Sequence, residues 1–399
     1  MTEPGRAAWL APLLKPASVA VVGASPKVGS AGYGMIRSLL QSGFEGRVYA
    51  VNPNYNEIEG VPCFPSLTDL PERIDHAILG VANARLEAVF REAVACKVGA
   101  GTIFASCYLP DDTEPKLLDR LRTLARDARM PICGGNGMGF LNLADKVYAT
   151  AWPPPDWIRG GGAMALITHS GSVFSALAKN DRRLRYNLVV SPGQEISATV
   201  ADYIDFALEE PTTRVIGLFL ETVRDPVGFG AALAKAEDRG IPIVALKVGR
   251  TEKSAKLAAS HSGAIVGDHA AYQAVFERYG VVEVENLDDL ANSMLLLSQP
   301  RRVRAGGLAT IHDSGGEREL LIDQADAYGV RLAEINDTTK DRLAARLEYG
   351  LEPVNPVDAW GTGHDYEGIF RDCLTAIAQD PDTAIAAMCV ETRTGNQLH

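Results

Sequence analysis

Long apolar runs are missing from this 399-residue sequence. No stretch approaches the roughly 18 consecutive apolar residues that a membrane-spanning helix needs. Residues 1–16 have an acidic residue near their start and no long apolar core, which is not typical of a secretory signal peptide. We therefore expect neither a membrane partner nor export.

Paired cysteines and an excess of basic residues are also missing. The six cysteines show no CxxC or CxxH spacing, so we expect no metal site and no disulfide framework, and a cytoplasmic protein. The 50 acidic residues outnumber the 39 basic ones, giving a net charge of −11, which argues against coating nucleic acid. The cysteines are Cys63, Cys96, Cys107, Cys133, Cys373 and Cys389.

The sequence does contain a regular alternation of short β-branched runs and amphipathic stretches. Apolar residues recur at helical spacing in 84–95 and 226–239. Strand and helix in this rhythm predict an α/β protein with parallel sheets covered by helices on both faces. The expected strands include 18–23, 47–52, 76–81, 163–168, 215–220, 243–247 and 307–312.

Two segments rich in proline, glycine or arginine divide the sequence. Residues 152–162 (WPPPDWIRGGG) and 298–307 (SQPRRVRAGG) are unsuited to a helix or a central strand. They predict three domains, at 1–150, 160–298 and 307–399, the third apparently truncated. The second and third domains are expected to have arisen by duplication, because ALITHSGS at 165–172 and ATIHDSGG at 309–316 share four of eight residues.

The first glycine-rich loop, residues 23–34 (GASPKVGSAGYG), lies between an expected strand and an expected helix at 35–41. Glycines let the backbone approach a phosphate, and a helix N-terminus offers free N–H groups. A tight turn without a ligand is the plainer alternative. The spacing is not a clean GxGxxG, and Val51-Asn52-Pro53 offers no acid to the ribose of NAD. A nucleotide other than NAD is favoured.

The second loop, Thr168-His169-Ser170-Gly171-Ser172, places hydroxyls and a glycine at another expected helix start. Such a loop can hold a phosphate or an oxyanion. An ordinary serine N-cap explains the same residues equally well.

The third signal is His261, flanked by small residues in 260–264 (SHSGA). Imidazole titrates near neutral pH, so it can attack phosphorus and later release it. A lone loop histidine is nevertheless more often structural. Glu221 follows the expected strand 215–220, where a carboxylate can face a ligand crevice and orient a histidine. Its alternative role is to cap the next turn.

In this order, the motifs resemble those of the NDP-forming (ADP-forming) acyl-CoA synthetase family, which is related to the succinyl-CoA synthetase alpha subunit. Residues 21–25 (VVGAS) and 48–53 (VYAVNP) resemble the CoA-binding domain. Residues 134–137 (GGNG) resemble the Gly-Pro-Asn-Cys segment that closes it. The remaining matches are 167–171 (ITHSG) to the phosphate-binding helix start, 220–225 (LETVRD) to the Glu-Gly-Ile-Arg-Asp strand end, 260–267 (SHSGAIVG) to the phosphohistidine loop, and 355–358 (NPVD) to the third domain.

The resemblance implies a Rossmann-like CoA-binding domain followed by flavodoxin-like succinyl-CoA-ligase-type domains with parallel sheets. His261 would be the phosphohistidine and Glu221 would orient or stabilise it. Ser170, Gly171 and Ser172 would hold the phosphoryl group. The residues implied to bind CoA are Gly23, Ser25, Pro26, Val51, Asn52, Pro53 and Asn136.

The family reaction makes an acyl-CoA in three steps. ATP phosphorylates the histidine, the phosphoryl group passes to a carboxylic acid, and the CoA thiol displaces phosphate from the acyl phosphate. ATP and ADP with Mg²⁺ would be bound by an ATP-grasp domain or beta subunit, which this sequence lacks, so a fragment of a longer chain is expected.

Several residues depart from the family pattern. His169 stands in place of a glutamine, Gly135 and Gly137 replace a proline and a cysteine, and Asn54 stands where a lysine is common. The Asn54 departure puts one CoA phosphate contact in doubt.

Other functions stay open from the sequence alone. The chain could be a regulatory module that binds CoA or acyl-CoA, or another acyl-CoA enzyme on the same core. An NAD-dependent oxidoreductase is disfavoured by the missing ribose acid. Acetate, branched acids and aryl acids all remain candidate substrates, and a homo-oligomer is one option for the assembly.

Overall fold

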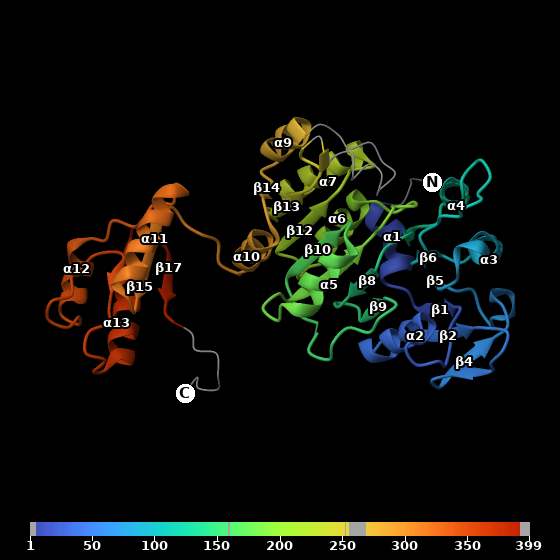
Figure 1. Cartoon of the computed structure of the whole chain (residues 1–399), viewed down its shortest axis with the longest axis horizontal. Coiled ribbons are helices and arrows are strands. Elements are labelled where there is room, and N and C mark those ends of the chain that lie inside the picture. Colours follow the sequence, from blue (N-terminus) through green and yellow to red (C-terminus); the bar gives the residue numbers. More distant parts are fainter. Residues whose placement is uncertain (1–4, 159, 252, 255–268, 392–399) are drawn as a thin grey trace. The chain divides into compact units, whose positions relative to one another are not determined.

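The computed structural model describes residues 5–158, 160–251, 253–254 and 269–391. The chain divides into two compact units, Met1–Pro300 and Arg301–His399, and Figure 1 labels most of their elements. Each unit contains mostly parallel strands and covering helices, which confirms the predicted α/β class.

The first sheet of the larger unit has seven strands in the order β3-β4-β2-β1-β5-β6-β7. Neighbouring strands in this sheet are parallel, except that β3 and β4 pair antiparallel. β2 pairs on one side of β1 and β5 on the other, so the direction of winding reverses there. The strands are β1 (Ser18–Val22), β2 (Arg47–Val51), β3 (Glu57–Ile58), β4 (Val61–Phe64), β5 (His76–Leu79), β6 (Ala100–Ile103) and β7 (Ile132–Gly134); the helices are α1 (Arg6–Leu14), α2 (Ala31–Ser42), α3 (Asn83–Ala95) and α4 (Leu117–Asp127), with a 3-10 turn η1 (Leu67–Asp69).

The second sheet has the order β14-β13-β12-β10-β11-β8-β9. β10 lies between β11 and β12, both parallel to it, so the winding reverses here as well. The strands are β8 (Gly139–Asn142), β9 (Val147–Ala149), β10 (Met164–Thr168), β11 (Tyr186–Ser191), β12 (Val215–Leu220), β13 (Ile243–Lys247) and β14 (Val282–Val284); the helices are α5 (Gly171–Asn180), α6 (Val200–Glu209), α7 (Pro226–Asp238), α9 (His269–Arg278) and α10 (Leu287–Leu297).

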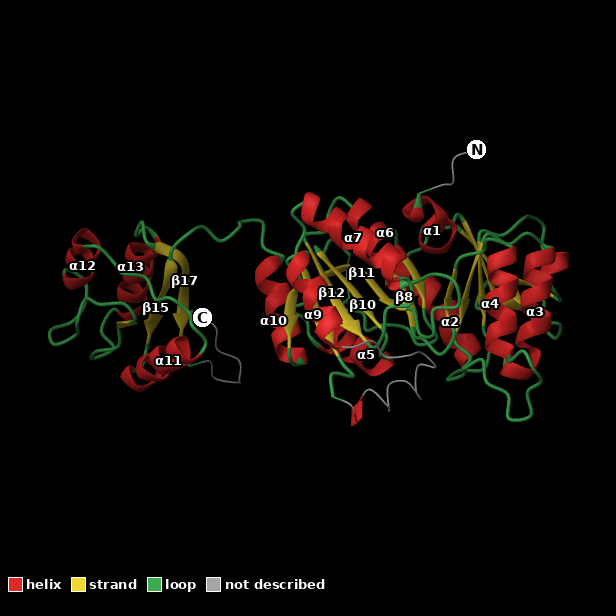
Figure 2. Ribbon diagram, turned by 90° about the horizontal axis from the view of Figure 1, so that it is seen from above, coloured by secondary structure: helices red, strands yellow, loops and turns green. Residues whose placement is uncertain are grey.

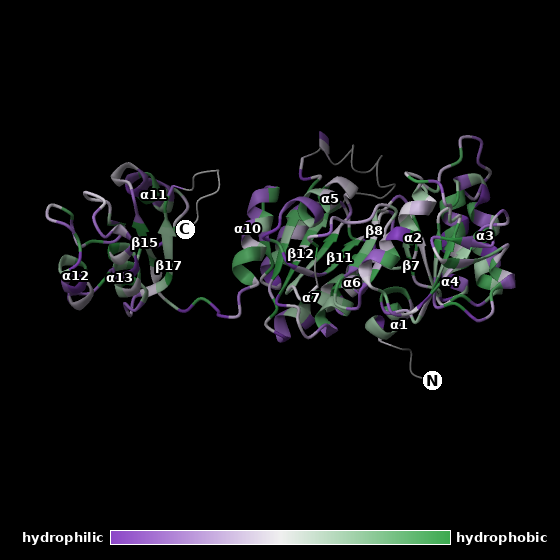
Figure 3. Ribbon diagram, turned by 90° about the horizontal axis from the view of Figure 1, so that it is seen from below, coloured by the Kyte–Doolittle hydropathy of each residue, from purple (hydrophilic) through white to green (hydrophobic). Residues whose placement is uncertain are grey.

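The two sheets of the larger unit share one hydrophobic core. A single buried cluster includes Val21 of β1, Phe140 of β8 and Ile216 of β12, together with apolar side chains of α1, α2, α6 and α7. Figure 2 shows α6 and α7 on one face of the second sheet and α5 on the opposite face. The apolar colouring of the strands in Figure 3 follows from this burial between helices.

The hairpin β8–β9 belongs to the second sheet, although the predicted first domain, 1–150, includes residues 139–149. β8 pairs antiparallel with β11, as Phe140 opposite Val190 and Leu141 opposite Val189. The proline- and glycine-rich segment 152–162 therefore follows the crossing from one sheet to the other. It contains no described helix or strand.

The smaller unit, Arg301–His399, contains a parallel sheet in the order β16-β15-β17. Its buried core includes Ile311, Val357 and Phe370. β15 runs into a helix that Ser314 caps, as β10 runs into a helix that Ser170 caps. The elements are β15 (Gly307–His312), α11 (Gly315–Ala327), α12 (Asp337–Ala344), β16 (Val357–Asp358), α13 (Tyr366–Ala378) and β17 (Thr383–Cys389).

Candidate functional site

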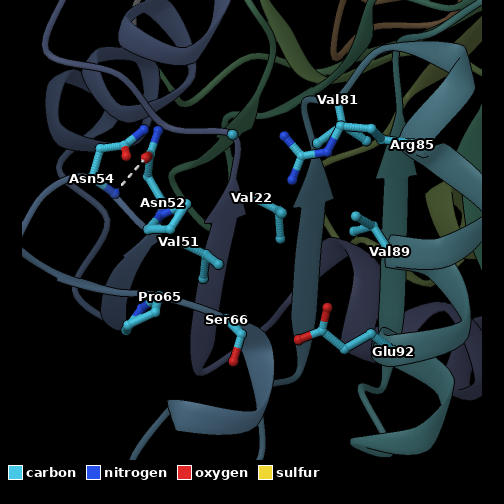
Figure 4. Close-up of a pocket in the computed structure, with 12 residues that line it drawn as sticks. Val22, Val51, Asn52, Asn54, Pro65, Ser66, Val81, Arg85, Val89 and Glu92 are labelled. Carbon is cyan, nitrogen blue, oxygen red and sulfur yellow. Dashed lines mark hydrogen bonds between the residues drawn. The ribbon is translucent and has the colours of Figure 1, made fainter.

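A pocket lies at the carboxyl ends of β1, β2 and β5, where the winding of the first sheet reverses. In doubly wound sheets such a crevice is the usual place for a nucleotide. Its volume is about 140 Å³, which suits part of a nucleotide rather than a whole one. The lining residues, all drawn and most of them labelled in Figure 4, are Val22, Gly23, Val51, Asn52, Pro53, Asn54, Pro65, Ser66, Val81, Arg85, Val89 and Glu92.

Gly23 lets the backbone turn sharply at the end of β1. Its φ is +83°, and an added Cβ would lie 2.5 Å from the carbonyl oxygen of Gly80. The loop then leads into α2, where Ser30 accepts a hydrogen bond from the Tyr33 amide at 3.2 Å. A Cβ on Gly32 would lie 2.3 Å from the Gly23 oxygen. Glycine at 23 and 32 is therefore needed for the loop to pack on the helix start.

Asn52 joins the two loops that form the pocket. Its Nδ2 donates to the Ala24 carbonyl at 2.8 Å, and its Oδ1 accepts from the Asn54 amide at 3.0 Å. The end of β2 is thereby fixed against the glycine loop.

Four of the seven residues predicted to bind CoA line this pocket: Gly23, Val51, Asn52 and Pro53. Ser25, Pro26 and Asn136 are not among its lining residues. Ser25 Oγ instead accepts from the Lys27 amide at 3.1 Å, and Asn136 is an exposed residue with a φ of +54° on the segment between the two sheets. Their roles stay predictions.

Sequence reasoning missed the wall that α3 contributes. Arg85, Val89 and Glu92 line the pocket from one face of this helix. Their spacing of four and three residues is the signal that could have revealed them. Glu92 accepts a hydrogen bond from the Leu67 amide at 2.8 Å.

A second cluster lies where the winding of the second sheet reverses. Ser170 caps α5, accepting from the Val173 amide at 3.3 Å. The Ser170 amide donates to Thr168 Oγ1 at 3.1 Å. The next two residues, Gly171 and Ser172, begin the helix, so their N–H groups belong to the first turn, where an anion is favoured.

His169, Glu195 and Arg224 form a buried polar group beside this helix start. His169 Nε2 lies 3.3 Å from Glu195 Oε1, and Arg224 Nε lies 3.6 Å from Glu195 Oε2. The Glu195 side chain is 0% exposed. Burial lowers the pKa of Arg224, while the Glu195 carboxylate opposes that shift. Glu195 also accepts from the Val200 amide at 2.6 Å, which anchors α6.

Glu221 connects this group to β13. Its amide donates to His169 Nδ1 at 3.1 Å, and its carbonyl accepts from Lys247 Nζ at 3.0 Å. Lys247 is buried over the Tyr272 ring, with Nζ 4.7 Å from the centroid. Burial lowers the pKa of Lys247 to about 8. The strand end that carries Glu221 is thus held from both sides.

Two regions of the chain match models of known domain families. Residues 17–142 match the model of a CoA-binding domain, and residues 161–297 match the model of the succinyl-CoA ligase-like flavodoxin domain. A trans-feruloyl-CoA synthase from an unknown prokaryotic organism is 31% identical over 92% of this chain and 53% of that protein. The alpha subunit of the ADP-forming acetate–CoA ligase I from Pyrococcus furiosus is 31% identical over 91% of this chain and 79% of that subunit. The chain belongs to the ADP-forming acyl-CoA ligase family.

A solved structure supports the same assignment. The dinucleotide-forming acetyl-coenzyme A synthetase 1 of Candidatus Korarchaeum cryptofilum, in complex with phosphate and ADP, matches with a TM-score of 0.85 and 26% identity over 96% of this chain and 82% of that one. The predicted family resemblance is confirmed. This chain spans about half the length of several curated relatives, including the feruloyl-CoA synthase.

Of the residues that the family resemblance implicates in catalysis, His261 lies outside the described part of the chain. Glu221 is described, and its backbone holds the contacts given above. Glu195 was missed because it follows a proline and a glycine after β11, in a stretch that reads as an ordinary loop.

Among the described residues there is no cluster of three or more His, Cys, Asp or Glu that could hold a metal. No helix described here is long and apolar enough to span a bilayer.

Proposed function

We propose that this chain binds CoA and carries the phosphoryl group in an acyl-CoA ligase of the ADP-forming type. The observation that carries the proposal is the presence of two separate sites at the two winding reversals of one compact unit. One is a pocket at the carboxyl ends of β1, β2 and β5, and the other is a helix start next to a buried charged group.

The pocket of the first sheet is proposed to bind CoA. Support comes from Gly23, which lines the pocket without a side chain that would keep a phosphate from the backbone, and from Asn52, which stands where an acid would select NAD. Ser25 and Pro26 are proposed to contact CoA from the glycine loop. Asn136 is proposed to reach it from the segment between the sheets.

The second site is proposed to hold the phosphoryl group. The N–H groups of Ser170, Gly171 and Ser172 would receive its negative charge at the start of α5. His261 would carry it as a phosphohistidine, and Glu221 would orient that imidazole. An imidazole nitrogen attacks phosphorus, and a carboxylate oxygen of the acid substrate then takes the phosphoryl group to give an acyl phosphate. The CoA thiol displaces phosphate from this acyl phosphate.

ATP would enter through an ATP-grasp part, either on a partner subunit or elsewhere in a longer polypeptide. That part would also bind Mg²⁺ with the nucleotide. The alpha-subunit relative from Pyrococcus furiosus supports the first arrangement, and the longer feruloyl-CoA synthase supports the second. The proposed substrate is a carboxylic acid, and the cysteine usage favours the cytoplasm.

The reverse half-reaction tests this function without ATP. The chain is incubated with radiolabelled inorganic phosphate and, in parallel, with acetyl-CoA, isobutyryl-CoA or feruloyl-CoA. Phosphate displaces the CoA thiol to give an acyl phosphate, and the imidazole then attacks its phosphorus, releasing the carboxylate. We expect acid-labile label on the wild type and on His269→Asn, and none on His261→Asn. CoA binding without label from any acyl-CoA would instead favour a regulatory binding module, and equal label on both variants would exclude His261.

A further inference from the structure

Arg85 is the cationic residue of the CoA pocket. Of the twelve lining residues, only Arg85 and Glu92 carry a charge, and Glu92 already accepts a hydrogen bond from the Leu67 amide. Figure 4 shows the Arg85 guanidinium leaving α3 beside Val81 and turning toward the side of the pocket where Asn52 lies.

Neighbouring arginines of this domain are engaged elsewhere. On α3, Arg91 pairs with Glu87 at 2.7 Å, and Arg120 of α4 pairs with Glu87 and Asp112. The Arg85 side chain forms no hydrogen bond or ion pair with any part of the chain that the structure describes. A guanidinium that lines a nucleotide pocket without a carboxylate partner is available to a ligand phosphate.

The wall of the pocket opposite Arg85, at the end of β2, indicates which phosphate of CoA the guanidinium would bind. In doubly wound nucleotide sites, the end of the second strand faces the adenosine ribose, and a nearby arginine accommodates a phosphate on that ribose. Here the end of β2 presents the neutral side chains of Asn52 and Asn54 to the same pocket. CoA carries a phosphate on its ribose and NAD does not. A guanidinium can donate two parallel N–H bonds to such a phosphate.

On the basis of the proposed CoA function, we propose that Arg85 binds the 3′-phosphate of the CoA ribose and makes the pocket selective for CoA over 3′-dephospho-CoA. The cation comes from the first turn of α3 and not from the end of β2. Because Arg85 is exposed at the mouth of the pocket, solvent screens the interaction and the expected effect is about fivefold in Kd.

Calorimetric titration with CoA and with 3′-dephospho-CoA tests this assignment. For the wild type we expect CoA to bind about fivefold more tightly than 3′-dephospho-CoA. Arg85→Gln should weaken CoA binding by about that factor and leave the Kd of 3′-dephospho-CoA unchanged. Arg91→Gln, on the same helix and ion-paired outside the pocket, is the matched control and should resemble the wild type.

A double variant places a positive charge on the opposite wall of the pocket, at the end of β2. Arg85→Gln combined with Asn54→Lys should recover part of the preference for CoA, because both positions line one pocket. Equal weakening of both ligands by Arg85→Gln, or no change in the Kd of CoA, would overturn the role of Arg85 while leaving the CoA function intact. A wild type that binds neither ligand would overturn the proposed function, and the role of Arg85 with it.

Discussion

His169 and Glu195 face each other inside the second sheet's domain, with His169 Nε2 3.3 Å from Glu195 Oε1. Because His169 Nδ1 accepts a hydrogen bond from the Glu221 amide, the neutral imidazole carries its proton on Nε2, which faces the Glu195 carboxylate. The pair joins the ends of β10 and β12 to the loop before α6. It therefore supports the backbone of Glu221, the residue proposed to orient the phosphohistidine.

Neutralising Glu195 should destabilise the larger unit. Glu195→Gln keeps the shape of the side chain but leaves the largely buried Arg224 without this carboxylate. Removing one partner of a buried charge pair costs about 3 kcal/mol, which urea unfolding would measure. The matched control is Glu45→Gln, whose side chain is 86% exposed and pairs with Lys146; it should not change the unfolding midpoint. An equally small effect at Glu195 would show that its carboxylate does not stabilise Arg224 and His169.

Ser170 should have two separable effects. Ser170→Ala removes the cap of α5 and should cost about 1 kcal/mol of stability. It should also lower the yield of phosphate label, because the same helix start is proposed to hold the phosphoryl group. Asn286→Ala removes the cap of α10, where Oδ1 accepts the Asp289 amide at 2.9 Å. This control should lose similar stability and keep full labelling. Equal labelling by both variants would remove α5 from the phosphoryl site.

Two glycines of the first loop provide a matched test of backbone approach. Gly23 and Gly29 have similar φ values, +83° and +82°, but a Cβ would collide with the Gly80 oxygen only at Gly23. Gly23→Ala should therefore displace the loop and abolish or strongly weaken CoA binding. Gly29→Ala should introduce only the backbone strain of a positive φ and leave the affinity for CoA nearly unchanged. Calorimetry with CoA measures the difference. Similar affinities of the two variants would place the ligand away from Gly23.

His76 should make stability depend on pH. It is buried in β5, stacked on Phe140 with ring centroids 5.7 Å apart, and burial lowers the pKa of His76 to about 3. Between about pH 6.5 and pH 3 the unfolded chain binds a proton that the folded chain does not. Stability therefore falls with falling pH, by up to about 1.4 kcal/mol per pH unit.

The variant His76→Leu cannot titrate. Its unfolding free energy should fall less steeply than that of the wild type between about pH 6 and pH 4, whatever its stability at neutral pH. Parallel slopes for the two proteins would show that His76 is not buried in its neutral form.

Strand positions could be predicted closely because buried parallel strands are continuous apolar runs. β12, β13 and β15 have the expected bounds of 215–220, 243–247 and 307–312. α2 begins at Ala31, four residues before the expected helix at 35–41. Its first turn contains two glycines, which lower helix propensity, yet Gly34 is required because a Cβ would lie 1.9 Å from the Ala151 oxygen.

The remaining features of the fold and of the candidate site depend on contacts between residues distant in the sequence. Nothing local indicates that β8 pairs with β11, nearly 50 residues later. The approach of Glu195 to His169 and Arg224 likewise arises from three different strand ends meeting at one edge of the sheet. The motif order identified the family, but only the folded chain brings Arg85 to the pocket.

The pocket at the ends of β1, β2 and β5 is proposed to bind CoA. Calorimetric titration of this chain with CoA, with NAD⁺ as the control, tests it most directly. We expect one CoA to bind per chain and NAD⁺ not to bind. Binding of NAD⁺, or of neither ligand, would contradict it.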